Sequence, residues 1–107
     1  MTMDVWVLGG VNRWDFRGLT VDRMTPEKRV RANDICLARS RQTGLWVWME
    51  GDRREDEISI YLETGLEFDA MLENLRRWLK LYAIGSDAQH CARAIEGLSY
   101  RDGELQA

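Results

Sequence analysis

The amino-acid sequence predicts a single α+β domain in which helices pack on an antiparallel sheet of four to five strands, in the order ββ-α-ββ-αα. The first observation is a set of apolar, β-prone runs in the earlier part of the chain. The second is a pair of helix-capping patterns at residues 64–67 and 86–89. A length of 107 residues with 45% hydrophobic content suits one core. We expect the domain to span residues 1–98, followed by a loose tail over residues 99–107.

The first two strands are predicted from alternation. Residues 4–8 form an apolar run that ends at a pair of glycines, and residues 13–17 alternate polar and aromatic side chains. Together these runs favour a first hairpin. Residues 19–24 are interpreted as either a short strand or a connecting loop.

The segment between the two hairpins is predicted to be helical. Thr25, Pro26 and Glu27 supply an N-cap hydroxyl, a proline at the first helical position and an acid in the first turn, so we expect a helix over residues 26–42. Its apolar residues do not gather on one face. A second interpretation is therefore kept open, with a short helix to about residue 32 and a strand over residues 35–40 that pairs with residues 45–50.

A second hairpin and the C-terminal helices complete the predicted order. Residues 45–50 and 58–63 are predicted to pair, and the charged residues between them to form a solvated tip. The capping box that begins at Thr64 opens an amphipathic helix to about Tyr82. The capping box that begins at Ser86 opens a shorter helix that stops at Gly97.

The charge is distributed unevenly along the chain. The net charge is −3, made up of +3 in residues 1–48 and −6 in residues 49–107. An acidic total argues against a generally cationic nucleic-acid binder. The two cysteines are far apart with no CxxC pattern, and no run approaches the ~20 apolar residues that span a bilayer. We therefore expect a cytoplasmic protein with no membrane association and no structural metal.

The residues that could support catalysis are few. His90 is the only histidine, and the neighbouring Cys91 projects about 100° away from it on a helix, so the two do not form a nucleophile and base pair. The acids of the predicted tip are solvated, which is unsuited to acid/base tuning. The sequence indicates a non-enzymatic protein without a cofactor, and a small enzyme that uses His90 is kept as the lesser alternative.

The function we expect is protein binding. A short acidic domain suits docking on a larger cytosolic protein with a basic surface, to inhibit, neutralise or adapt it, as immunity proteins and phage anti-defence inhibitors do. The five tryptophans are expected to be mostly in the core, with Trp78 at the margin of its helix as the exception. A homodimer contact there is the other interpretation. The predicted binding residues are Glu50, Asp52, Glu55, Asp56, Glu57, Trp78 and Leu81.

Nucleic-acid binding is the alternative function. Basic residues concentrate in the first half of the chain, where Trp6 or Trp14 could add stacking to phosphate contacts. Interspersed acids favour a solvated face with local ion pairs instead. The residues that would carry this alternative are Arg13, Arg17, Arg29 and Arg31.

Overall fold

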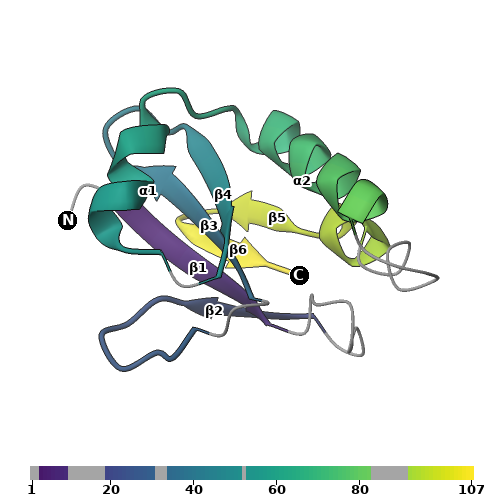
Figure 1. The fold of residues 1–107 in the computed structure, drawn as a ribbon, viewed down its shortest axis with the longest axis horizontal. Coiled ribbons are helices and arrows are strands. Elements are labelled where there is room, and N and C mark those ends of the chain that lie inside the picture. Colours follow the sequence, from purple (N-terminus) through teal and green to yellow (C-terminus); the bar gives the residue numbers. More distant parts are fainter. Residues whose placement is uncertain (1–2, 10–18, 31–33, 52, 83–91) are drawn as a thin grey trace.

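A four-stranded antiparallel sheet forms the centre of the molecule (Figure 1). The computed structural model describes residues 3–9, 19–30, 34–51, 53–82 and 92–107. The strands follow the order β2-β1-β3-β4 across the sheet, which places β1 and β3 at its centre. Their bounds are β1 (Met3–Gly9), β2 (Thr20–Arg23), β3 (Ile35–Ser40) and β4 (Trp46–Glu50). The predicted class, one α+β domain with helices on an antiparallel sheet, is confirmed.

The first strand lies where the sequence predicts it, and residues 20–23 are a strand rather than a loop. β1 pairs with β2, with Trp6 opposite Arg23. The expected hairpin partner at residues 13–17 lies outside the described residues.

The helix predicted over residues 26–42 is wrong, because residues 26–30 are turn and irregular backbone and residues 35–40 form β3. The strand of the second interpretation, residues 35–40 paired with residues 45–50, is confirmed, whereas its short helix does not form over residues 26–30. Every position from Ile35 to Ala38 is buried, as expected of a central strand covered on both faces. The Thr25-Pro26 pattern marks a β-turn instead of a helix start, since the backbone N–H of Lys28 donates to the carbonyl of Thr25 at 3.1 Å.

The second hairpin pairs β4 with β3 and not with residues 58–63. Val47 lies opposite Ala38, and residues 41–45 connect the two strands. The strand predicted over residues 58–63 is wrong, because residues 58–62 form the second half of a helix, α1 (Glu55–Leu62). Ile58 and Leu62 are buried one helical turn apart, and the acids at its start suit the positive end of a helix dipole.

The longer helix is confirmed as α2 (Phe68–Tyr82), with Met71, Leu75 and Leu79 buried along one face. Thr64 is not its N-cap, because α2 begins only at Phe68; the Thr64 hydroxyl instead donates to the carbonyl of Tyr61, near the end of α1. Residues 92–96 are helical and stop before Gly97, as predicted. The predicted cap at residues 86–89 lies outside the described residues.

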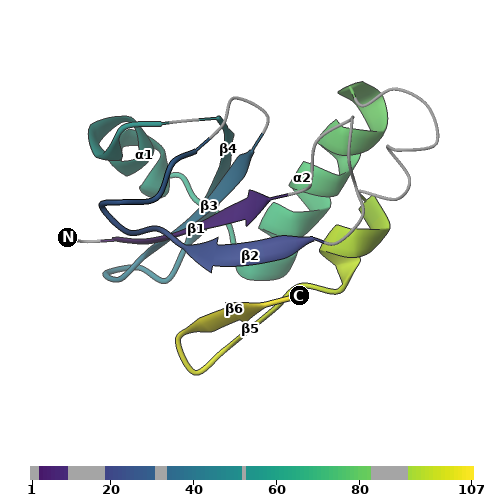
Figure 2. The ribbon, with the colours of Figure 1, turned by 90° about the horizontal axis from the view of Figure 1, so that it is seen from below.

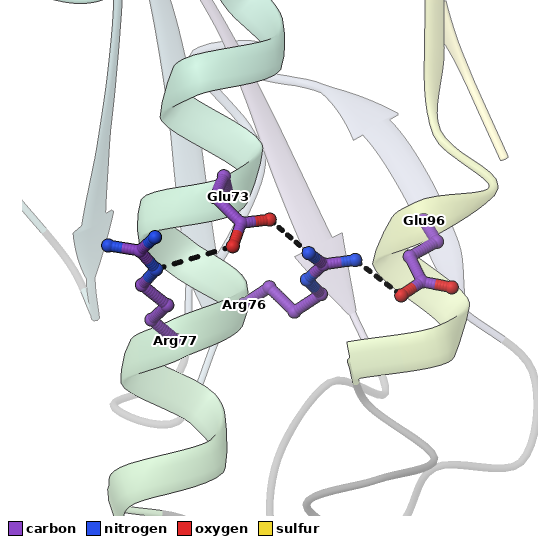
Figure 3. A network of polar contacts seen from close by, with 4 residues as sticks. All are labelled: Glu73, Arg76, Arg77 and Glu96. Carbon is purple, nitrogen blue, oxygen red and sulfur yellow. Dashed lines mark hydrogen bonds and ion pairs between the residues drawn. The ribbon is translucent and has the colours of Figure 1, made fainter.

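An ion-pair network joins α2 to the helical residues 92–96 (Figure 3). The Arg76 guanidinium lies between the carboxylates of Glu73 and Glu96, and Arg77 pairs with Glu73 from the next turn. Charged partners on two helices thus fix how these helices lie against one another.

In place of the loose tail expected at residues 99–107, the chain forms a second, two-stranded sheet. It consists of β5 (Ser99–Arg101) and β6 (Glu104–Gln106), joined by Asp102 and Gly103. Both turn residues have positive φ, 52° and 79°, which is the requirement of a two-residue type I′ turn. Leu105 is buried in the main core.

The sheet is covered on both faces (Figure 2). On one face α2 and the C-terminal hairpin enclose an aromatic-rich core that includes Trp6, Trp46 and Leu75. On the other face α1 packs over a smaller core that includes Val5 and Cys36. Trp46 and Trp48 therefore point toward α2, and Val47 and Met49 point toward α1.

Candidate functional site

The acids predicted to bind a partner lie at the end of β4 and the start of α1. Glu55, Asp56 and Glu57 form the first turn of α1 rather than a hairpin tip, and Glu50 is the exposed last residue of β4. Asp52 lies outside the described residues. The described acids therefore lie on β4 and α1, and not in the tip of a hairpin between two strands, as the sequence predicts.

Of the two predicted apolar contacts, one is exposed and the other is largely covered. Leu81 is 77% exposed near the end of α2. Trp78 is half-buried and packs on Trp48 with ring centroids 5.1 Å apart. Trp48 is fixed further by Asn74, whose side-chain oxygen accepts a hydrogen bond from the indole N–H at 2.8 Å. Trp78 is thus part of the packing between α2 and β4.

The residues of the alternative functions are mostly outside the described part of the chain. Arg29 is exposed, whereas Arg13, Arg17 and Arg31 are not described. His90 is not described either. The predicted cationic face, apart from Arg29, and the site around the histidine therefore lie outside the described residues.

A groove opens beside β4, between the end of α1 and the first half of α2. Its volume is about 250 Å³. Tyr61 and Leu66 line it and are 52% and 43% exposed, so it presents large apolar side chains to solvent. Its lining is predominantly apolar and comprises Trp46, Val47, Trp48, Met49, Tyr61, Thr64, Gly65, Leu66, Met71 and Asn74.

The connection from α1 to α2 closes one end of this groove. Trp46 and Leu66 exchange two backbone hydrogen bonds, at 2.7 and 2.8 Å, in an isolated antiparallel bridge. Gly65 permits this approach, because a Cβ there would lie 3.0 Å from both the Leu45 Cβ and the Trp46 carbonyl oxygen. The bridge spans one residue of β4 and goes no further.

Beyond the bridge, the outer edge of β4 is open. Backbone groups alternate in direction along a strand, and those of Trp46 point outward to Leu66. The amide of Gly51 points the opposite way, toward the carbonyl of Asp34 at 2.7 Å. Trp48 and Glu50 share the outward direction of Trp46. Among the described residues, no backbone partner meets the outward amides of Trp48 and Glu50.

The segment that supplies part of the groove lining is rich in acids. Residues 53–69, which include α1 and the connection to α2, contain six acids and two arginines. Glu63 and Glu67 are exposed beside the lining residues. Of the two arginines, Arg53 pairs with Glu57 at 3.6 Å and donates to the Glu50 carbonyl at 3.1 Å, and Arg54 is the exposed N-cap residue of α1.

A second charged cluster lies on the opposite half of the sheet. The Asp4 carboxylate accepts hydrogen bonds from Arg41 and Arg23 at 2.6 and 2.7 Å. The bonds from Arg41 lower the pKa of Asp4 below its ordinary value, partial burial opposes this, and Arg23 lowers it further. The single carboxylate bridges two guanidinium groups, one from β2 and one from the residue after β3, and so links β1 to both neighbouring strands.

Few polar side chains line the groove. Its polar side chains are the hydroxyls of Tyr61 and Thr64 and the amide of Asn74, with no nucleophile placed beside a base. In the described parts of the chain, no three His, Cys, Asp or Glu residues are grouped to hold a metal ion. No described helix has the length and hydropathy needed to cross a bilayer.

The groove is not predicted from the sequence, because it depends on residues 58–62 being helical, and the acids predicted to bind a partner are not among its lining residues. Gly65 is the one local signal, as a glycine between Thr64 and Leu66 just after a helix end. A scan against protein-family models, a search of curated proteins and a search of solved structures each gave no match.

Proposed function

We propose that this protein is a non-enzymatic module that docks on a larger cytosolic protein through the groove beside β4 and thereby inhibits, neutralises or adapts it. The observation that carries the proposal is an apolar groove beside the outer edge of β4, lined in part by an acid-rich segment of the chain. Concave apolar surfaces with a few polar groups are where proteins bind their ligands.

The charge around the groove supports a basic partner surface. Opposite charges accelerate encounter and exclude partners of the wrong sign, while desolvated apolar contacts supply most of the affinity. Tyr61 and Leu66 would provide the apolar contacts, and the acids of α1 would orient the partner. This division of roles predicts two classes of variant with different effects.

The experiment is co-purification from the native host with quantitative mass spectrometry. Glu55→Lys with Asp56→Lys should reduce recovery of the partner severalfold, because it reverses charge beside the groove. Leu66→Asp should abolish recovery, because it places a charge in the apolar contact. A matched reversal on distant exposed acids, Glu27→Lys with Glu104→Lys, should retain the partner.

All three variants should melt within a few degrees of the wild type, since the substituted residues are exposed. Equal recovery from both charge reversals would contradict the proposal. If the partner is lost on treatment with nuclease, and is lost from Arg29→Glu rather than from the acid variants, the nucleic-acid alternative is favoured.

A further inference from the structure

We infer that the groove receives an extended, cationic segment of the partner protein, which adds as a fifth strand to the outer edge of β4. This inference rests on the proposed docking function and specifies its binding mode. It follows from three features of the described residues: the unequal chemistry of the two sheet edges, the direction of the backbone groups of β4, and the sign of the surrounding charge.

The two edges of the sheet differ in how they are protected. Sheet edges are normally guarded by charge, proline or coverage, because an open edge pairs with other chains. At the β2 edge, Asp22 pairs with Lys28 at 3.1 Å and Arg23 pairs with Asp4 at 2.7 Å. The β4 edge has the sequence Trp-Val-Trp-Met-Glu, without lysine or proline. An apolar edge beside a groove is suited to accept a strand.

The backbone of β4 offers the hydrogen bonds that such a strand needs. The bridge between Trp46 and Leu66 already shows pairing at this edge, with both bonds below 3 Å. The next outward groups are the N–H and carbonyl of Trp48 and the N–H of Glu50. A partner strand that continues from the bridge would bond these groups and place alternate side chains toward Met49 and Tyr61, which line the groove.

The charge selects a cationic partner over a second copy of this chain. A symmetric dimer through β4 would bring the same acidic rim, Glu50, Glu63 and Glu67 included, against itself. Like charges in that position oppose association. A segment with lysine or arginine on its outward-facing positions would instead meet opposite charge.

The first test uses three synthetic nine-residue peptides and calorimetric titration of the whole protein. The first alternates valine with lysine, the second is the same peptide N-methylated on every second residue, and the third replaces lysine with glutamate. The valine-lysine peptide should bind and slow hydrogen exchange at the amides of Trp48 and Glu50. N-methylation should weaken binding about tenfold or more, because it removes the donors that a strand supplies. The glutamate peptide should not bind.

The second test compares two substitutions at Glu50, a residue whose amide points outward and whose side chain is exposed. Glu50→Pro removes the amide donor and the charge, and proline is tolerated at a sheet edge. Glu50→Gln removes the charge alone. The proline variant should weaken the valine-lysine peptide about three- to tenfold more than the glutamine variant does.

Each outcome separates strand addition from the proposed function. Strand addition is wrong if no peptide binds, if N-methylation has no effect, or if Glu50→Pro, still folded, binds like Glu50→Gln. The docking function then stands if the Glu55 and Asp56 reversal still loses the co-purified partner, and fails if it does not. Should Glu50→Pro unfold, the N-methylated peptide decides alone. A stable dimer in sedimentation that the proline variant abolishes would assign the edge to a second copy and overturn the inference.

Discussion

Trp6 on β1 and Trp46 on β4 stack with ring centroids 5.3 Å apart and planes inclined by 26°, although β3 separates their strands. Tyr100 from the C-terminal hairpin lies edge-on to both rings, at 5.8 and 5.0 Å. The guanidinium of Arg39 also lies over the Tyr100 ring, 5.2 Å from its centroid, in a cation–π contact. The hairpin at residues 99–106 therefore covers the aromatic core.

Leu105→Ala tests the contribution of that hairpin. Leu105 is 5% exposed, so its truncation should lower the free energy of unfolding by about 2–4 kcal/mol. Its exposed neighbour Gln106, changed to alanine, should cost about 0.5 kcal/mol or less. Urea unfolding followed by tryptophan fluorescence measures both values, and equal costs would show that the hairpin does not pack on the core.

Two leucines of α2 test the orientation of that helix. Leu75→Ala removes a side chain that is 0% exposed and should cost about 2–5 kcal/mol. Leu81→Ala makes the same chemical change at a position that is 77% exposed and should cost about 0.5 kcal/mol or less. Thermal unfolding in which Leu81→Ala was the more damaging change would contradict the arrangement of α2 on the sheet.

Gly65→Ala tests the close approach that forms the bridge between Trp46 and Leu66. The added methyl group would meet two atoms at 3.0 Å, so the substitution should destabilise the protein by about 1–3 kcal/mol. Hydrogen exchange at the Trp46 amide should also accelerate. Gly97→Ala is the control, because its Cβ would have only an ordinary contact, 3.5 Å from the Ala94 carbonyl oxygen. An unchanged Trp46 amide in Gly65→Ala would refute the proposed steric role.

Asp4→Asn tests the ion-pair cluster and its dependence on pH. The folded-state pKa of Asp4 is lowered, chiefly by hydrogen bonds from Arg41, so its carboxylate stabilises the fold at pH values above the unfolded pKa of about 3.9. The substitution should cost about 1 kcal/mol near pH 7. The difference from wild type should shrink as the pH falls below about 4 and through the lowered folded pKa. Chemical unfolding across pH 2.5–7 measures it, and a difference independent of pH would contradict this role.

The fold class could be predicted because it depends on composition and on patterns that are local. The apolar stripe of α2 has a single interpretation, since Phe68, Met71, Leu75 and Leu79 repeat at a mixture of three- and four-residue spacings, which only a helix uses. The segment 58–62 was ambiguous for a physical reason. Ile58 and Leu62 are four residues apart, and that spacing satisfies both the helical turn and the alternation of a strand. Ile60 decides between them, and its 70% exposure is known only from the structure.

The C-terminal hairpin could have been found in the sequence. Asp102-Gly103 is a strong signal for a two-residue hairpin turn, and Tyr100 and Leu105 are the apolar positions on either side of it. Low apolar content obscured this signal, because the hairpin contributes only two side chains to the core.

The groove could not have been predicted from local patterns. It forms where β4, the connection after α1 and the first turns of α2 lie close together in the fold. No short sequence motif predicts that these segments are neighbours. The acids around it were found because net charge can be counted along the chain, whereas the open edge of β4 depends on the strand order of the sheet.

The contact between Trp6 and Tyr100 also bears on how the chain folds during synthesis. The two residues are separated by almost the whole length of the described chain, yet their rings meet over the same core. Until residues 99–106 have emerged from the ribosome, the indoles of Trp6 and Trp46 lack the part of their cover that Tyr100 provides, and a nascent chain exposes that part of its apolar surface. The order of translation therefore sets a period in which this protein depends on rapid completion, or on a chaperone, to avoid association through its largest side chains.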